Sequence, residues 1–251
     1  MTDLDKKRID AIVRFALKED VWTGDITSQA VIDRFLKADG VIISRQEAIA
    51  CGMNMAERVF AAVDCTTRFR PAVSDGDVIR PGMEMAFVGG DAQSILKAER
   101  TALNFMGIMS AVATNTRKLV DAVEGTGIEI YDTRKTIPLH RYLQKYAVTV
   151  GGGRNHRKGL WDMVLIKDNH IRAFSMQTGI TDSARLFPEI IKRAREQAQK
   201  NVRLEVEVET LAECEAALGA RPDVVMLDNM SPELIIKAVE MRKKMISSGD
   251  I

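Results

Sequence analysis

The sequence predicts an α/β fold in which a turn-rich first part is followed by parallel β/α units. From residue 125 onward, short apolar runs typical of buried strands alternate with segments of helical periodicity. Before that point, turn residues cluster between 71 and 82, and a long apolar periodic segment covers 92–124. Alternating strands and helices can form either an open sheet or a barrel, so both architectures remain open at this stage.

In the first part, apolar spacing predicts an amphipathic helix over 4–19, and Gly24–Ser28 is typical of a turn. The next elements are two strands separated by one helix. The segment 92–124 has Gly107 as its one breaker and predicts one or two helices. The strands are expected at 38–45 and 77–89, and the helix at about 52–63.

In the second part, five short apolar runs are candidate strands, and the stretches 183–199 and 210–218 have helical periodicity. The candidate strands are Ile128–Tyr131, Ala147–Val150, Met163–Ile166, Arg203–Val208 and Val224–Leu227.

Composition narrows the class of protein. A chain of 251 residues with 46% hydrophobic content can bury a full core. Its formal net charge of +1 offers no basic field, so no nucleic-acid partner is expected. The three cysteines are odd in number and lack metal-site spacing, which favours a reducing cytoplasm. We expect no signal peptide and no membrane partner, because no apolar run approaches the length of about 20 residues that a span needs.

Charged and polar clusters follow the candidate strands. In open sheets and barrels alike, ligands bind beyond the C-terminal ends of the strands. A row of cations at such ends suits a small polyanion. The clusters are Asp-Thr-Arg-Lys-Thr at 132–136, Gly-Gly-Gly-Arg-Asn-His-Arg at 151–157, Lys-Asp-Asn-His at 167–170, Glu207, and Asp228-Asn229.

Each cluster alone has an ordinary structural interpretation. The segment 132–136 could be a solvated loop, His156 a packed histidine, and 205–209 a strand with one exposed face. The glycines at 151–153 could form a simple flexible connection. Alternatively, glycine lets backbone N–H groups approach an anion closely. Together, five polar clusters at strand ends favour the functional interpretation.

The residue types indicate recognition of a substrate with several negative charges. Arginine binds carboxylates in a bidentate manner, and lysine supplies a point charge to phosphate. The carboxylates Glu207 and Asp228 suit either a Mg²⁺ ion that enters with pyrophosphate or a positive charge that develops on the substrate. A glycosyl transfer through an oxocarbenium-like ribose needs both groups, but the residue types do not name the substrate.

The motifs resemble those of the quinolinate phosphoribosyltransferase family, also known as nicotinate-nucleotide pyrophosphorylases, over nearly the whole chain. The motifs that carry the resemblance are Gly24–Ser28, Glu99–Asn104, Asp132–Thr136, Gly151–Arg157, Leu165–His170, Glu205–Val208 and Leu227–Asn229.

This resemblance implies an activity and its residues. The reaction would join quinolinate to 5-phosphoribosyl 1-pyrophosphate and yield nicotinate mononucleotide, pyrophosphate and CO₂, as a step of NAD biosynthesis. Mg²⁺ would accompany the pyrophosphate, with no direct side-chain ligand. Lys135, Glu207 and Asp228 would be catalytic. The residues expected to bind substrates are Arg100, Arg134, Lys135, His156, Arg157, Lys167, Glu207 and Asp228.

The resemblance also implies the architecture and the assembly. An α/β sandwich domain over 1–109 would precede an incomplete α/β barrel of about seven strands over 110–251, here C-terminally shortened. The active unit would be at least a homodimer, with Arg100 reaching the partner's site.

The chain departs from the family pattern at three places. Leu139-His140 follows Pro138 where relatives have glycine, and Ser110 is followed by Ala111 instead of glycine. The sequence ends at Ile251, before the segments that bind the ribose 5-phosphate in relatives. It is therefore either a truncated product or a naturally shortened member.

Two other functions remain open at this stage. One is a non-catalytic or impaired homologue that binds the pyridine dicarboxylate or only oligomerises. The other is a related protein of molybdate transport, although Asp132 and the clusters at 155–157 and 167–170 favour the quinolinate enzyme. A zinc site is disfavoured, because the three histidines lack ligand spacing.

Overall fold

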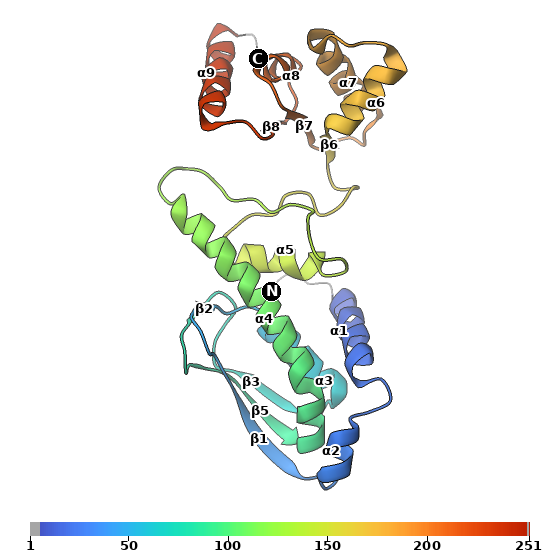
Figure 1. Cartoon of the computed structure of the whole chain (residues 1–251), viewed down its shortest axis with the longest axis vertical. Coiled ribbons are helices and arrows are strands. Elements are labelled where there is room, and N and C mark those ends of the chain that lie inside the picture. Colours follow the sequence, from blue (N-terminus) through green and yellow to red (C-terminus); the bar gives the residue numbers. More distant parts are fainter. Residues whose placement is uncertain (1–5, 250) are drawn as a thin grey trace. The chain divides into compact units, whose positions relative to one another are not determined.

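The structure is a computed structural model that describes residues 6–249 and residue 251. It separates into two units, Met1–His156 and Arg157–Ile251 (Figure 1). Each unit has its own hydrophobic core. The domain division expected at 109/110 remains a prediction.

The first unit contains helices packed beside small antiparallel sheets (Figure 1). The first predicted helix is present, although its expected start at Leu4 lies outside the described residues. The helices are α1 (Lys6–Val21), α2 (Ile26–Val31), α3 (Met53–Val63), α4 (Ala92–Ala122) and α5 (Arg141–Val150), and the strands are β1 (Lys37–Ile43), β2 (Ala48–Ile49), β3 (Arg68–Pro71), β4 (Val78–Ile79) and β5 (Glu84–Asp91).

A three-stranded antiparallel sheet with the order β1-β5-β3 forms one layer of this unit. Burial alternates along β1, so one face of this strand points toward the core and the other is exposed. The predicted strand at 77–89 is two strands, because the chain turns between Arg80 and Met83, where the Met83 N–H donates to the Arg80 carbonyl (3.0 Å). Gly82 has a φ of 83° in this turn, a conformation that glycine adopts without strain.

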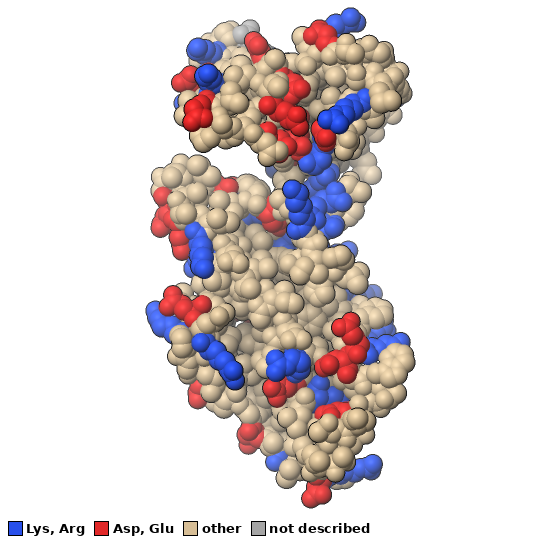
Figure 2. All heavy atoms as spheres, viewed as in Figure 1, with Lys and Arg blue, Asp and Glu red and all other residues tan. Residues whose placement is uncertain are grey.

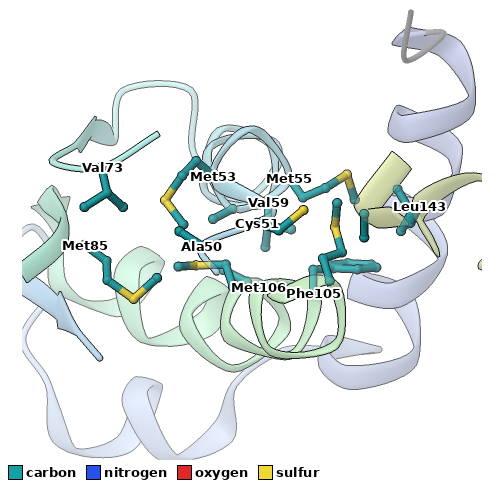
Figure 3. Close-up of a cluster of buried hydrophobic side chains, with 14 of the residues drawn as sticks. Ala50, Cys51, Met53, Met55, Val59, Val73, Met85, Phe105, Met106 and Leu143 are labelled. Atoms are coloured by element: carbon teal, nitrogen blue, oxygen red, sulfur yellow. The ribbon is translucent and has the colours of Figure 1, made fainter. Parts of the chain in front are cut away.

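The core of the first unit lies between α3, α4, α5 and the sheet (Figure 3). Met55, Val59 and Phe60 of α3 are almost completely buried, and the Phe60 ring stacks on Phe69 of β3 with 5.7 Å between centroids. The Cys51 thiol is buried among these side chains. Burial and the nearby Asp75 carboxylate raise the pKa of this thiol, so it stays protonated at neutral pH.

Three further predictions for the first unit need correction. Gly24–Ser28 is not only a turn, because Asp25 accepts the Ser28 N–H (3.0 Å) and caps α2, which begins at Ile26. Ile128–Tyr131 is reduced to one parallel bridge between Tyr131 and Arg154. Ala147–Val150 is the end of helix α5 and not a strand. Its β-branched residues suggested a strand, but Leu143 and Ala147, one turn apart, bury a helical face in the core.

The second unit is built on a parallel sheet of β6 (Val164–Ile166), β7 (Leu204–Val208) and β8 (Val224–Leu227), in that order. These three strands confirm the predicted runs at 163–166, 203–208 and 224–227. The helices are α6 (Asp168–Thr178), α7 (Ser183–Gln197), α8 (Leu211–Gly219) and α9 (Pro232–Ser248), of which α7 and α8 were predicted.

On the face of the first unit that Figure 2 shows, Lys and Arg side chains are interspersed with Asp and Glu. This mixture agrees with the near-zero net charge and forms no broad basic field on that face. Among the helices of residues 6–249, none combines the length and the apolar character that crossing a membrane requires.

Candidate functional site

The C-terminal edge of the β6–β8 sheet gathers three of the predicted residues. Ile166 pairs with Val206 and Val208 pairs with Leu227, so the parallel strands end at the same edge. Lys167 directly follows β6, and Asp228 directly follows β8. Glu207 is the last residue but one of β7. The sheet therefore places one cation and two carboxylates side by side, as the sequence predicted.

Lys167 and Glu207 form an ion pair between their Nζ and Oε2 atoms. The Glu207 side chain is 9% exposed, whereas that of Lys167 is 40% exposed and can reach a ligand. Asp228 is half-buried and accepts a hydrogen bond from Asn229 Nδ2 (3.1 Å). Because burial of an unpaired carboxylate is costly, Lys167 stabilises Glu207 as well as supplying positive charge at this edge.

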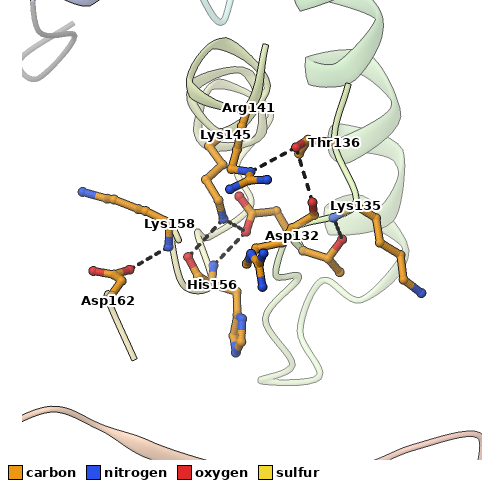
Figure 4. A network of polar contacts seen from close by, with 10 residues as sticks. Asp132, Lys135, Thr136, Arg141, Lys145, His156, Lys158 and Asp162 are labelled. Atoms are coloured by element: carbon orange, nitrogen blue, oxygen red, sulfur yellow. Dashed lines mark hydrogen bonds and ion pairs between the residues drawn. The ribbon is translucent and has the colours of Figure 1, made fainter. Parts of the chain in front are cut away.

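The segment 132–137 of the first unit carries two further predicted residues. Arg134 is half-buried, and its Nε is buried without an acceptor among the described residues. Lys135 is exposed, and its side chain points away from the surrounding polar contacts (Figure 4). A buried guanidinium nitrogen without an acceptor is uncommon in folded proteins, and a carboxylate ligand would satisfy it.

His156 belongs to the first unit and is attached to the same segment. Its backbone N–H donates to Asp132 Oδ1 (2.9 Å), and its carbonyl accepts a hydrogen bond from Lys145 Nζ (3.1 Å) (Figure 4). Lys145 Nζ also pairs with Asp132 Oδ1. Two predicted residues of the first unit, Arg134 and His156, are therefore connected through Asp132 and Lys145.

The glycines at 151–153 do not form an anion cradle, and that interpretation is wrong. Their N–H groups donate to the carbonyls of Ala147 (3.0 Å), Thr149 (3.1 Å) and Val148 (3.0 Å), which end helix α5. The glycine cluster also follows a helix and not a strand. The reason for glycine at Gly151 is close packing, since a Cβ there would lie 2.5 Å from the Ala113 carbonyl oxygen of α4.

Gly151→Ala is therefore expected to destabilise the first unit by about 1–3 kcal/mol, the usual cost of overpacking. The matched control is Gly107→Ala, because within the described part of the chain a Cβ at this exposed position of α4 meets nothing within 4 Å. Alanine at position 107 should raise the free energy of unfolding by about 0.5–1 kcal/mol. Urea-induced unfolding followed by circular dichroism measures both changes, and equal effects of the two substitutions would contradict the packing argument.

The remaining predicted residues lie in different places. Arg100 is exposed on α4, and Arg157, the first residue of the second unit, is 9% exposed. The first unit thus holds Arg100, Arg134, Lys135 and His156, and the second holds Arg157, Lys167, Glu207 and Asp228.

The first unit has a surface groove of about 300 Å³ that is lined in part by Gly152, Gly153 and Arg154 of the predicted polar cluster, but by none of the residues predicted to be catalytic or to bind substrates. Arg154 and Glu129 form an ion pair at this groove (2.5 Å). A hydrogen bond from the Tyr131 hydroxyl and the Arg154 guanidinium hold the pKa of Glu129 below its usual range. In the described ranges, no three His, Cys, Asp or Glu side chains are grouped as metal ligands.

Sequence reasoning missed the polar residues of α5. Arg141 Nε donates to Thr136 Oγ1 (3.1 Å), and Gln144 Oε1 accepts the Ile137 N–H (2.9 Å). With Lys145 they have the spacing i, i+3 and i+4, which forms one face of a helix. That pattern could have been recognised, but the strand interpretation of 147–150 concealed the helix.

Comparison with known proteins identifies the family. The model of the quinolinate phosphoribosyl transferase N-terminal domain matches residues 25–110, and the model of the C-terminal domain of the same family matches residues 112–249. Together the two models cover most of the chain.

Relatives of known name give a consistent result. A protein of Arabidopsis thaliana named nicotinate-nucleotide pyrophosphorylase [carboxylating], chloroplastic, is 38% identical over 231 residues, which cover 88% of this chain and 63% of that protein. A Bacillus subtilis (strain 168) protein named probable nicotinate-nucleotide pyrophosphorylase [carboxylating] is 37% identical over 217 residues, which cover 86% of this chain and 71% of that protein. The chain thus spans less than two thirds of the length of the plant relative.

A solved structure of the nicotinate-nucleotide pyrophosphorylase from Francisella tularensis matches with a TM-score of 0.87 and 37% identity. The match covers 96% of this chain and 82% of that one. This likeness confirms the predicted α/β fold class; of the expected barrel of about seven strands, the described residues contain a parallel sheet of three. The two family models and the identities above 30% show that the chain belongs to the quinolinate phosphoribosyl transferase family.

Proposed function

We propose that this chain transfers the phosphoribosyl group of 5-phosphoribosyl 1-pyrophosphate to quinolinate and, with loss of CO₂, forms nicotinate mononucleotide for NAD biosynthesis. The observation that carries the proposal is the C-terminal edge of β6–β8, where Lys167, Glu207 and Asp228 gather. The names of the relatives and membership of the family support the same reaction.

Quinolinate carries two carboxylates, which call for cationic partners. In the first unit these are Arg134, whose buried Nε has no acceptor in the described structure, and His156. In the second unit they are Arg157 and Lys167. Arginine binds a carboxylate through paired N–H donors, so Arg134 within the first unit and Arg157 within the second each suit a carboxylate of the substrate.

The carboxylates Glu207 and Asp228 would stabilise the transition state. As the C1–oxygen bond to pyrophosphate breaks, positive charge develops on the ribose, and the buried Glu207 side chain supplies a fixed negative charge with little solvent screening. The exposed Lys135 would neutralise phosphate oxygens. Mg²⁺ would enter bound to the pyrophosphate of the substrate and need no direct side-chain ligand. This agrees with the ion pair in which Glu207 already has Lys167 as its partner.

The pyridine nitrogen of quinolinate attacks C1 of the ribose, and the bonding electrons leave with pyrophosphate. The ring nitrogen becomes cationic and accepts the electron pair released when the neighbouring carboxylate departs as CO₂. A proton then replaces the carboxylate on the ring carbon. No covalent bond to the protein is needed, so positioning and electrostatic stabilisation supply the rate enhancement.

We infer that the active unit is a homodimer in which Arg100 of one copy serves the site of the other. Arg100 is exposed on α4, and the exposed side chain of Leu96 lies one turn before it. Helix α2 packs against α4 and exposes Ile26 and Val31, which are 77% and 74% accessible. Exposed apolar side chains beside a cation are typical of a surface that a second protein covers.

A mixing experiment tests this assembly. Arg100→Ala and Lys167→Ala chains should each be nearly inactive, because each lacks one residue of every site. In a dimer formed from one chain of each kind, one site carries both changes and the other carries neither. Refolding an equal mixture should therefore restore about a quarter of wild-type activity. Activity no higher than the mean of the two separate variants would contradict a shared site.

We place this enzyme in the cytoplasm, a proposal that the thiols support. Cys51, Cys65 and Cys214 are all unbonded in the structure. Free thiols are typical of reducing compartments.

The proposed reaction is tested by incubating the chain with quinolinate, 5-phosphoribosyl 1-pyrophosphate and Mg²⁺ and measuring nicotinate mononucleotide by mass spectrometry. Nicotinate in place of quinolinate is the control, since it lacks the carboxylate that leaves. We expect product from quinolinate alone. Saturable quinolinate binding without product would instead favour a non-catalytic homologue.

A further inference from the structure

Helix α5 is firmly attached to the first unit. Leu143 and Ala147 are buried in the core, at 1% and 0% exposure. The Tyr146 hydroxyl donates to Asp75 Oδ2 (2.8 Å), and Asp75 Oδ1 accepts the N–H of Met53 at the start of α3 (3.0 Å). Burial and the Asp75 carboxylate raise the pKa of Tyr146, so its hydroxyl remains a donor at neutral pH.

The opposite side of α5 presents three polar side chains, Arg141, Gln144 and Lys145, which we name the polar face of α5. Arg141 and Lys145 contact the segment 132–137 that contains Arg134 (Figure 4), and Gln144 accepts the N–H of Ile137 in the same segment. Lys145 pairs with Asp132 at the start of the segment, and the Arg141 and Gln144 bonds hold its end. The segment is thus held on both sides of Arg134 by one rigid helix.

Lys145 and Asp132 also hold the chain on either side of His156. The Lys145 ammonium donates to the His156 carbonyl (3.1 Å), and Asp132 Oδ1 accepts the His156 N–H (2.9 Å). In the orientation that satisfies its hydrogen bonds, the Asn155 side-chain nitrogen donates to Asp132 Oδ2 (2.6 Å) and to the Lys145 carbonyl (2.9 Å). Both oxygens of Asp132 therefore accept hydrogen bonds, and the ammonium of Lys145 donates to two acceptors, Asp132 and the His156 carbonyl.

The burial of this ion pair indicates a role in geometry. The side chains of Lys145 and Asp132 are only 6% and 7% exposed. Taking two charges out of water costs several kcal/mol, and apolar residues of similar volume often give equal or greater stability. Apolar residues cannot form the directional hydrogen bonds that position Arg134 and His156 relative to each other. Lys145 forms such bonds with Asp132, two residues before Arg134, and with the carbonyl of His156 itself.

We propose that Lys145 is a positioning residue for the pyridine dicarboxylate: through Asp132 and the His156 carbonyl it fixes the backbone from which Arg134 and His156 reach the carboxylates. This proposal rests on the proposed function. Neither the ammonium of Lys145 nor the carboxylate of Asp132 contacts the substrate in this scheme, because both are buried in the network.

The test replaces Lys145 with methionine, which keeps most of the length of the side chain and removes its charge, and compares it with Lys118→Met on the exposed surface of α4. We expect Lys145→Met to raise the KM for quinolinate about tenfold or more. The KM for 5-phosphoribosyl 1-pyrophosphate should change less than about twofold, because Lys135, the residue of this segment proposed to contact phosphate, is exposed and its long flexible side chain can adjust. Lys118→Met should leave both values unchanged.

Loss of fold alone would not produce this split. A merely structural role predicts that both KM values stay normal in the folded fraction, or rise together, and either result would overturn the proposal. If Lys145→Met does not fold, Lys145→Arg provides the test. It keeps the positive charge of the buried pair but changes the position of the donors that reach Asp132 and the His156 carbonyl. It should raise the quinolinate KM about threefold with the same selectivity.

The wild-type chain separates this inference from the proposed function. If wild type forms no nicotinate mononucleotide, the proposed function is contradicted. If wild type is active and neither variant shows the selective rise in the quinolinate KM, only the positioning role of Lys145 is contradicted.

Discussion

Replacing Lys167 with alanine is expected to lower kcat/KM for quinolinate at least about tenfold, a loss of about 1.4 kcal/mol in transition-state stabilisation. Lys167 directly follows β6, and its ammonium pairs with Glu207. The change removes a cation that would bind substrate and leaves the buried Glu207 carboxylate without its partner. Steady-state kinetics with each substrate varied separately measures the loss and assigns it to kcat or to KM.

Arg134→Ala should cause a loss of similar size, because it removes the guanidinium whose Nε lacks an acceptor in the described structure. Matched controls are Lys192→Ala on α7 and Arg80→Ala in the turn after β4, both of which change exposed cations. Each control should retain activity within about twofold of wild type. Near-normal turnover in Lys167→Ala or Arg134→Ala would remove that residue from the proposed site.

The parallel strands were predictable because their sequences satisfy one physical rule. A strand covered by helices on both faces is a short continuous apolar run, and Val164–Ile166 and Val224–Leu227 have that form. Leu204–Val208 is fully buried despite its two glutamates, of which Glu207 is paired with Lys167. The prediction of its position was correct, but local sequence does not show that a buried carboxylate has found a cation.

Helix α5 was missed because local preference and tertiary packing disagree there. Val148, Thr149 and Val150 are β-branched and individually favour strands. The packing of Leu143 and Ala147 into the core outweighs that preference, which is worth only tenths of a kcal/mol per residue. The glycines that follow were misread for the same reason, since their N–H groups end a helix that the sequence pattern did not reveal.

The residues proposed to bind substrate could be recognised in the sequence, but the residues that position them could not. Arginine, lysine and carboxylate at strand ends have a chemistry that can be read directly from residue type. In the sequence Lys145 resembles an ordinary surface lysine, whereas in the fold it is buried beside Asp132, 13 residues earlier in the chain. A positioning residue is defined by its contacts, so it can be identified only once the backbone is known.

Phe60→Ala is expected to cause the largest loss of stability among the substitutions considered, about 3–5 kcal/mol in the free energy of unfolding of the first unit. The Phe60 side chain is 2% exposed and stacks on Phe69 with an angle of 27° between the rings. The substitution removes buried apolar area, leaves a cavity and abolishes the ring contact, which adds about 0.5–1.5 kcal/mol. Since domains are commonly stable by only about 5–15 kcal/mol, this loss is a large fraction of the total.

Phe15→Ala provides the matched comparison, because it removes the same atoms from a side chain of α1 that is 64% exposed. Its expected cost is within about 0.5 kcal/mol, as for other surface positions. Both variants differ from wild type by the same chemical change, so the difference between their unfolding free energies in urea measures burial alone. A loss in Phe60→Ala no greater than that in Phe15→Ala would mean that the α3–β3 contact does not stabilise the unit. A third variant, Phe60→Leu, removes less volume than Phe60→Ala. Its expected loss of about 1 kcal/mol in the free energy of unfolding would show that the loss grows with the volume removed.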